Sequence, residues 1–200
     1  MEKSGPKKES SAKSAKKGRL GPPHFVAIGL AVAGVLLLWL LLSSGDDGSD
    51  SDGTATIPAS TPTVQLVSES ELLGAMQGVG YPVYWAGPRV GVKYEVSRPE
   101  DGRTFVRYLP EGEEAESERP FLTVGSYEKP GALASIKELG QEPGSLLVQV
   151  AGGGSAYAKG PDATSAYLAF PGVNTQVEVY DPQAGKALSL VRSGAIVPVG

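Results

Sequence analysis

The residues that could do chemistry in this chain are few, and its single histidine decides much of the question. His24 directly precedes an uncharged apolar run that begins at Phe25, and the chain has no cysteine. A thiol nucleophile, a thiolate metal site and a disulfide framework are therefore excluded. A Ser-His-Asp triad or a histidine-ligated metal centre would need His24 itself. The sequence predicts no catalytic residue, no metal ligand and no cofactor.

Two glycine-rich stretches come close to known motifs but do not match them. Gly152–Ala156 lacks the second glycine of a nucleophile elbow and is not followed by the Gly-Lys-Ser/Thr of a phosphate-binding loop. Gly78–Val83 lacks the third glycine of a dinucleotide-binding turn. The chemistry that remains is a Ser155–Lys159 pair or two carboxylates brought together by the fold. A small envelope enzyme of that kind is the alternative to a non-catalytic protein.

A second set of residues could form a binding face. Tyr84 and Trp85 are neighbours on a predicted strand, so one of them should point out of the core. Arg89 follows in the next turn, and Arg103 and Arg107 alternate along a predicted hairpin. Aromatic residues and arginine are favoured anchors at interfaces. We therefore predict a binding face from these five residues; the plainer interpretation makes Trp85 a core residue and leaves the arginines in solvent.

The element that positions everything else is the apolar run Phe25–Leu42. Its 18 residues carry no charge, and as a helix they would span about 27 Å, close to the hydrocarbon thickness of a bilayer. Residues 1–24 have a net charge of +5, whereas residues 43–63 have a net charge of −4. By the positive-inside rule the N-terminus is cytoplasmic and the C-terminal part is extracytoplasmic. A cleaved signal peptide is the competing interpretation, and the long run and long preceding tail favour an anchor.

The two segments beside this helix are expected to be disordered. Residues 1–24 are rich in Lys, Ser and Gly, which predicts a tail that contacts anionic lipid headgroups or serves only as a topology signal. No nucleic-acid partner is expected, because basic residues are not interleaved with aromatic ones. Residues 43–63 contain Asp, Ser, Gly, Thr and Pro and predict a flexible linker.

A folded domain is predicted for residues 64–200. Ser68 and Glu71 have the spacing of a capping box, which indicates a helix start. Apolar residues alternate with Lys93 and Glu95, which is typical of a half-buried strand, and Thr104–Leu109 is its expected hairpin partner. Tyr81–Ala86 predicts a further strand. Residues 110–120 carry five glutamates and predict a solvated loop.

The later half of the domain repeats one pattern. Each copy has a strand, a tyrosine, an acidic residue, a proline near the first helical turn, a helix and a glycine. The predicted helices are Gly131–Leu139 and Gln183–Arg192, the second with Asp181 as its N-cap. The predicted strands are Phe121–Tyr127, Ser145–Val150, Ser165–Phe170, Gln176–Tyr180 and Ala195–Val199, and Ala151–Thr164 is expected to be a loop. This predicts an α+β domain with a mixed, largely antiparallel sheet covered by two or three short helices.

Residues 121–200 resemble the sporulation-related repeat (SPOR) domain. The resemblance rests on the strand end Val124–Tyr127 before an Ala-rich helix and on the second strand-helix-strand unit. It implies a ferredoxin-like domain at the outer end of a single-pass membrane protein and peptidoglycan glycan strands as the ligand. The anchor and the Ala-, Gly-, Val- and Pro-rich composition are also similar to membrane-anchored envelope proteins of high-GC bacteria.

These observations favour a non-catalytic binding or scaffolding module of the cell envelope. It would be held in the cytoplasmic membrane by Phe25–Leu42, and its ligand would be an envelope protein or a wall polymer. Besides the enzyme described above, a transmembrane regulatory protein that acts through its cytoplasmic tail is a further alternative.

Overall fold

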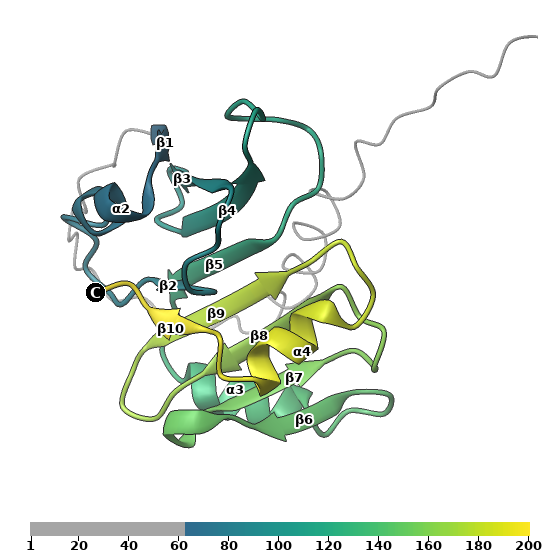
Figure 1. The fold of residues 1–200 in the computed structure, drawn as a ribbon. Coiled ribbons are helices and arrows are strands. Elements are labelled where there is room, and N and C mark those ends of the chain that lie inside the picture. The colour runs from purple at the N-terminus through teal and green to yellow at the C-terminus, as the bar shows by residue number, and fades with distance from the viewer. Residues whose placement is uncertain (1–62) are drawn as a thin grey trace, which may run out of the picture. The chain divides into compact units, whose positions relative to one another are not determined.

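The computed structural model describes residues 63–200, which are built around an eight-stranded sheet (Figure 1). The strand order is β1-β3-β4-β5-β9-β8-β7-β6, and all neighbours are antiparallel. The strands are β1 (Thr63–Val67), β3 (Val92–Arg98), β4 (Thr104–Pro110), β5 (Thr123–Glu128), β6 (Leu146–Gln149), β7 (Ser155–Ala158), β8 (Ser165–Ala169) and β9 (Thr175–Tyr180). The other elements are the helices α2 (Glu69–Ala75), α3 (Ala132–Leu139) and α4 (Lys186–Arg192), the 3-10 turn η1 (Ala151–Gly153), and a ribbon of β2 (Tyr84–Trp85) with β10 (Val197–Pro198).

The α+β class, the largely antiparallel sheet and the three short helices are thereby confirmed. The prediction of a mixed sheet is wrong for residues 63–200, because every neighbouring pair of strands is antiparallel. The capping box is present at Ser68, where the Glu71 carboxylate accepts a hydrogen bond from the Ser68 N–H at 2.8 Å. The predicted hairpin is also present as β3 and β4.

The two helices of the repeated pattern lie on opposite sides of the sheet (Figure 1). Successive residues of a strand point to opposite sides, so Ala156 of β7 packs toward α4 while Tyr157 packs toward α3. We name the two sides after these helices. The α4 side holds the main core, which α2 and the β2–β10 ribbon also cover. Its largest buried side chains on β3, β4, β5 and β9 include Tyr94, Val96, Val106, Val124, Val177 and Val179.

The two predicted β-α-β units have different surroundings. α3 connects β5 to β6, and three other strands lie between these two in the sheet. The strand after α4 is β10, which leaves the large sheet and pairs with β2. The sheet therefore does not contain two equivalent units.

Three local predictions need correction. The predicted loop Ala151–Thr164 contains β7, whose residues Ser-Ala-Tyr-Ala are all buried. The second helix begins at Lys186 instead of Gln183, so Asp181 is not its N-cap; its carboxylate accepts the Gln183 N–H at 2.9 Å in the preceding turn. Tyr81–Ala86 shrinks to the two residues of β2, because the ribbon pairs only there.

The anchor Phe25–Leu42, the tail 1–24 and nearly all of the linker 43–63 lie outside the residues that the structure describes. Within residues 63–200, no helix has the length and apolar character needed to cross a bilayer.

Candidate functional site: the Glu95–Arg107 pair and its strap

The five residues of the predicted binding face divide into two groups. Three of them lie on the α4 side. Tyr84 is buried, and Trp85 packs edge-to-face on Tyr94 with ring centroids 5.5 Å apart. The Arg89 guanidinium lies 5.2 Å from the centre of the Tyr108 ring. These three residues are therefore tied to the aromatic core, with Trp85 and Arg89 partly exposed.

The other two residues lie on the α3 side. Arg103 forms an ion pair with Asp101, in which Nε donates to Oδ2 at 2.7 Å, and its guanidinium lies over the Phe105 ring at 5.3 Å. Arg107 lies on β4, two residues after Phe105, and pairs with Glu95. The structure thus brings Arg103 and Arg107 together on one side of the sheet and separates them from the aromatic group.

The Glu95–Arg107 ion pair is the most buried charged contact among the described residues. The two residues are direct partners in the β3–β4 register, which places both side chains on the same side of the sheet. Arg107 Nη1 donates to Glu95 Oε1 at 2.6 Å, and the side chains are 19% and 3% exposed, respectively. The alternating pattern of β3 predicted a solvated Glu95. It is buried because the segment after β4 folds over it.

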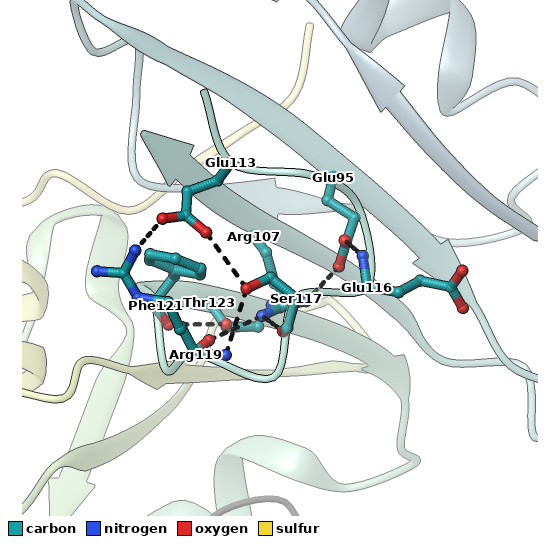
Figure 2. Close-up of polar contacts among 8 residues, drawn as sticks. All are labelled: Glu95, Arg107, Glu113, Glu116, Ser117, Arg119, Phe121 and Thr123. Atoms are coloured by element: carbon teal, nitrogen blue, oxygen red, sulfur yellow. Dashed lines mark hydrogen bonds and ion pairs between the residues drawn. The ribbon is translucent and has the colours of Figure 1, made fainter. Parts of the chain in front are cut away.

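That segment, residues 111–120, is called the strap below. Its backbone is held at three points by the ion pair (Figure 2). The second Glu95 oxygen accepts the N–H of Glu116, and Arg107 Nη2 donates to the carbonyl oxygens of Ser117 at 2.8 Å and Arg119 at 3.1 Å. The predicted solvated loop is exposed, as expected, but its backbone is attached to the sheet.

Contacts within the strap add to this order. Arg119 forms an ion pair with Glu113, whose other oxygen accepts the Ser117 hydroxyl at 3.3 Å (Figure 2). The Phe121 ring lies beside two guanidinium groups: its centre is 5.7 Å from Cζ of Arg107 and 5.5 Å from Cζ of Arg119. Glu116 has a φ of 60°, the one positive value for a non-glycine residue within 63–200. Such a conformation persists only where the surroundings impose it.

The energetics of the pair indicate a positional role. Moving two charges out of water costs several kcal/mol per ion, and apolar replacements of buried ion pairs are often neutral or stabilising. Stability alone is therefore a weak reason for Glu95 and Arg107 to be here. What the pair does contribute is a fixed backbone for the strap, so that the exposed carboxylates, Arg119 and the half-exposed Phe121 keep one arrangement.

A second polar feature of the α3 side is Glu178 on β9. Burial raises the pKa of this carboxyl group, and the Tyr167 hydroxyl donates to it at 3.0 Å. Its partner across the β5–β9 ladder is Gly125, over which the Phe105 ring lies so closely that a Cβ at Gly125 would be 2.9 Å from it. Sequence reasoning missed Glu95 and Glu178 as buried groups. No local signal marked them, because a carboxylate between two apolar residues on a strand is also the ordinary pattern of a solvated face.

The side chains proposed for an enzyme are placed apart. Ser155 Oγ accepts from Gln149 Nε2 at 3.2 Å, whereas Lys159 pairs with Glu142 at 2.5 Å. Four residues of extended chain separate Ser155 from Lys159 by about 13 Å. Within residues 63–200, no group of His, Asp and Glu side chains is suited to hold a metal ion.

Comparison with known proteins finds no match. No protein-family model fits the chain, and neither the characterised proteins nor the solved structures contain a significantly similar one. The order of elements also differs from the ferredoxin-like β-α-β-β-α-β order that the SPOR resemblance implies. Between α3 and α4 the chain has four strands instead of two.

Proposed function

We propose that residues 63–200 form a non-catalytic binding module, anchored by Phe25–Leu42 on the outer side of the cytoplasmic membrane, and that its contact surface is the strap with Arg119 and Phe121. The observation that supports this is the Glu95–Arg107 pair, which bonds the strap backbone at Glu116, Ser117 and Arg119. No residue of the strap itself is buried. The order of the strap therefore does not come from packing of its own side chains.

A rigid exposed loop is useful for binding because the entropic cost of ordering it has been met before the partner arrives. Surface loops on a rigid scaffold are also the usual place for binding residues. Here the scaffold is the β3–β4 hairpin and the first residues of β5. Arginine beside an aromatic ring is a frequent anchor at protein interfaces, and Arg119 beside Phe121 has that arrangement.

The proposal is tested by site-specific photocrosslinking in cells that make the full-length chain. A photoreactive amino acid replaces Glu114 in the strap, and the matched control replaces Glu100, an exposed glutamate in the β3–β4 turn. We expect an adduct from position 114 and none from position 100. Arg107→Met should abolish the adduct, and so should Glu95→Gln/Arg107→Met, which leaves no unpaired buried charge and therefore keeps the protein folded. An adduct that forms equally at both positions, or that survives Arg107→Met, would contradict the proposal.

The class of ligand is tested with the same variants. The full-length protein in detergent micelles is sedimented with isolated cell wall. Pelleting that depends on Arg107 indicates a wall polymer, whereas a protein adduct without pelleting indicates an envelope protein. Neither result would count against the strap as a binding surface.

The proposed location has its own test, which uses the absence of cysteine. Single cysteines are introduced as Ser4→Cys in the tail and Ser193→Cys in the exposed turn after α4. A membrane-impermeant maleimide applied to intact cells should label position 193 only. Labelling of position 4 would overturn the orientation.

A further inference from the structure

Strand β6 (Leu146–Gln149) forms one edge of the sheet. Among residues 63–200 it pairs with β7 alone, so its other side has no partner there, and Figure 1 shows it as the last strand of the sheet at that end. The Val150 N–H donates to the Gly154 carbonyl at 3.0 Å. Along an edge strand of an antiparallel sheet, the backbone N–H and C=O groups of successive residues point alternately toward the neighbouring strand and away from it. The backbone groups of Val148 therefore point toward β7 like those of Val150, whereas the backbone groups of Leu147 and Gln149 point away from the sheet.

In the part of the chain that the structure describes, this edge has neither a charged side chain nor a proline to oppose pairing, and its main protection is a length of only four residues. Proteins commonly protect edges with Lys, Pro, a bulge or a covering segment. Residues 144–158, which comprise β6, η1, β7 and the turn before them, contain no charged residue and no proline. An extended partner would therefore meet no charge here, and complementarity favours an uncharged strand.

An apolar cavity of about 330 Å³ begins where β6 ends. Val150 and Ala151 form one part of its wall, and Leu168 and Val191 form another. Tyr84 and Phe170, whose rings stack at 5.2 Å, also contribute. The cavity lies on the α4 side, toward which Leu146, Val148 and Val150 point as half-buried side chains. Its volume is at the small end of the range for ligand pockets, and it suits one bulky side chain better than a whole small molecule.

We infer that β6 is a docking edge for an extended, uncharged peptide segment of a partner protein, which adds a ninth strand and places an apolar side chain in the cavity beside Val150. Recognition of this kind takes affinity from main-chain hydrogen bonds and specificity from pockets for alternate side chains. The outward groups of Leu147 and Gln149 would supply the hydrogen bonds. Every second residue of the peptide would face the α4 side, and the one next to Val150 is within reach of the cavity.

The opposite edge, β1, is the natural comparison. β1 is also uncharged, but the cavity is bordered by the end of β6 and by none of the residues of β1. A wall glycan fits the β6 edge poorly, because the groups that line the cavity are mainly apolar. This docking edge is separate from the strap, so the two proposals can fail independently.

The test uses the full-length chain in detergent micelles and the peptide Ac-TVTFTV-NH2. Binding is measured by fluorescence anisotropy of a labelled peptide, and hydrogen exchange identifies the strand involved. We expect slower exchange at the Leu147 and Gln149 amides and binding at least 10-fold tighter than for Ac-TVTATV-NH2. Gln149→Pro should weaken binding at least 10-fold, because it removes an outward N–H at a position that an edge strand tolerates. Gln149→Ala, which keeps that N–H, should bind normally.

Ala151→Phe provides a second variant that leaves β6 unchanged. It narrows the cavity from an exposed position, so the preference for the Phe peptide over the Ala peptide should disappear. Protection that appears on β1 instead of β6, or equal binding by Gln149→Pro and Gln149→Ala, would overturn the inference. So would protection of Leu147 and Gln149 that grows with protein concentration in the absence of peptide, because the edge would then belong to a second copy of this chain.

Discussion

Replacing Arg107 by methionine tests the central feature of the candidate site. Arg107→Met keeps an unbranched apolar stem but removes the guanidinium group and with it the charge that faces Glu95. The Glu95 side chain is 3% exposed, so its carboxylate has little access to water as a substitute partner. Removing one partner of a buried pair costs about 3–5 kcal/mol.

Two further hydrogen bonds disappear with the guanidinium group, those to the carbonyl oxygens of Ser117 and Arg119. Each is worth about 0.5–1.5 kcal/mol when its partner is buried. The strap is at the surface, where water replaces most of that loss, so we keep the estimate at about 3–5 kcal/mol. This is a large part of the 5–15 kcal/mol that holds a typical domain together. The double variant Glu95→Gln/Arg107→Met removes both charges and should recover most of the loss.

Urea unfolding of residues 46–200 measures this difference. These residues form one compact unit with Trp85 as the only tryptophan, so fluorescence reports on the fold without interference. A glutamate-specific protease reports on the strap, which has five glutamates. Arg107→Met should be cut there much faster than the parent. A loss below about 1 kcal/mol together with an unchanged cleavage rate would refute the reasoning, because the pair would then neither be a buried charge contact nor hold the strap.

The remaining predictions concern single side chains. Burial in the folded domain raises the pKa of Glu178 above its ordinary value of 4.5, so ionisation opposes folding. The carboxyl group therefore destabilises the domain increasingly as pH rises from about 4.5 through the raised pKa. Glu178→Gln should therefore gain stability relative to the parent between pH 4 and pH 7 in urea titrations, and a gain that is independent of pH would count against a buried acid. Gly125→Ala should cost about 1–3 kcal/mol, because its Cβ would press on the Phe105 ring at 2.9 Å. Gly194→Ala should cost about 1–2 kcal/mol, because φ is +73° at this residue. Gly74→Ala, in open space within α2, should instead stabilise by about 0.5–1 kcal/mol, and urea titrations measure all three glycine variants.

The elements that sequence reasoning found are those with local signals. The helix after Ser68 has a capping box, β3 has strict alternation around Tyr94, and α3 is bounded by Gly131 and Gly140. Each of these signals spans at most ten residues and needs no knowledge of what packs against it. Strand β7 has no such signal, because Ser-Ala-Tyr-Ala lacks branched residues and follows three glycines. Its small residues are explained only by the close approach of a helix to each side of the sheet.

The candidate site depends on contacts between residues that are further apart in the sequence. Arg107 lies 12 residues from Glu95, and Glu116 lies 21 residues from it. The hairpin turn sets the first separation, so pairing of Glu95 with Arg107 could in principle be read from an aligned β3 and β4. The contact of Glu95 with Glu116 depends on the path of the irregular strap, which the periodicity of apolar residues does not describe. The five residues of the predicted face are divided between two surfaces for a similar reason, since Trp85 and Arg107 belong to opposite sides of the sheet.

The α3 side of the sheet has two covers, and their chemistry differs. α3 covers β7 and β8 with Ala132 and Ile136, which are fully buried, so burial of apolar surface explains its position. The strap covers β3 and β4 without burying a single one of its own side chains. If the strap were only a cover, leucine or valine in place of Glu95 and Arg107 would do the same at lower cost. The charged pair is better explained by the shape that it gives to the strap than by the surface that the strap conceals, and a fixed shape is what the proposed binding role requires.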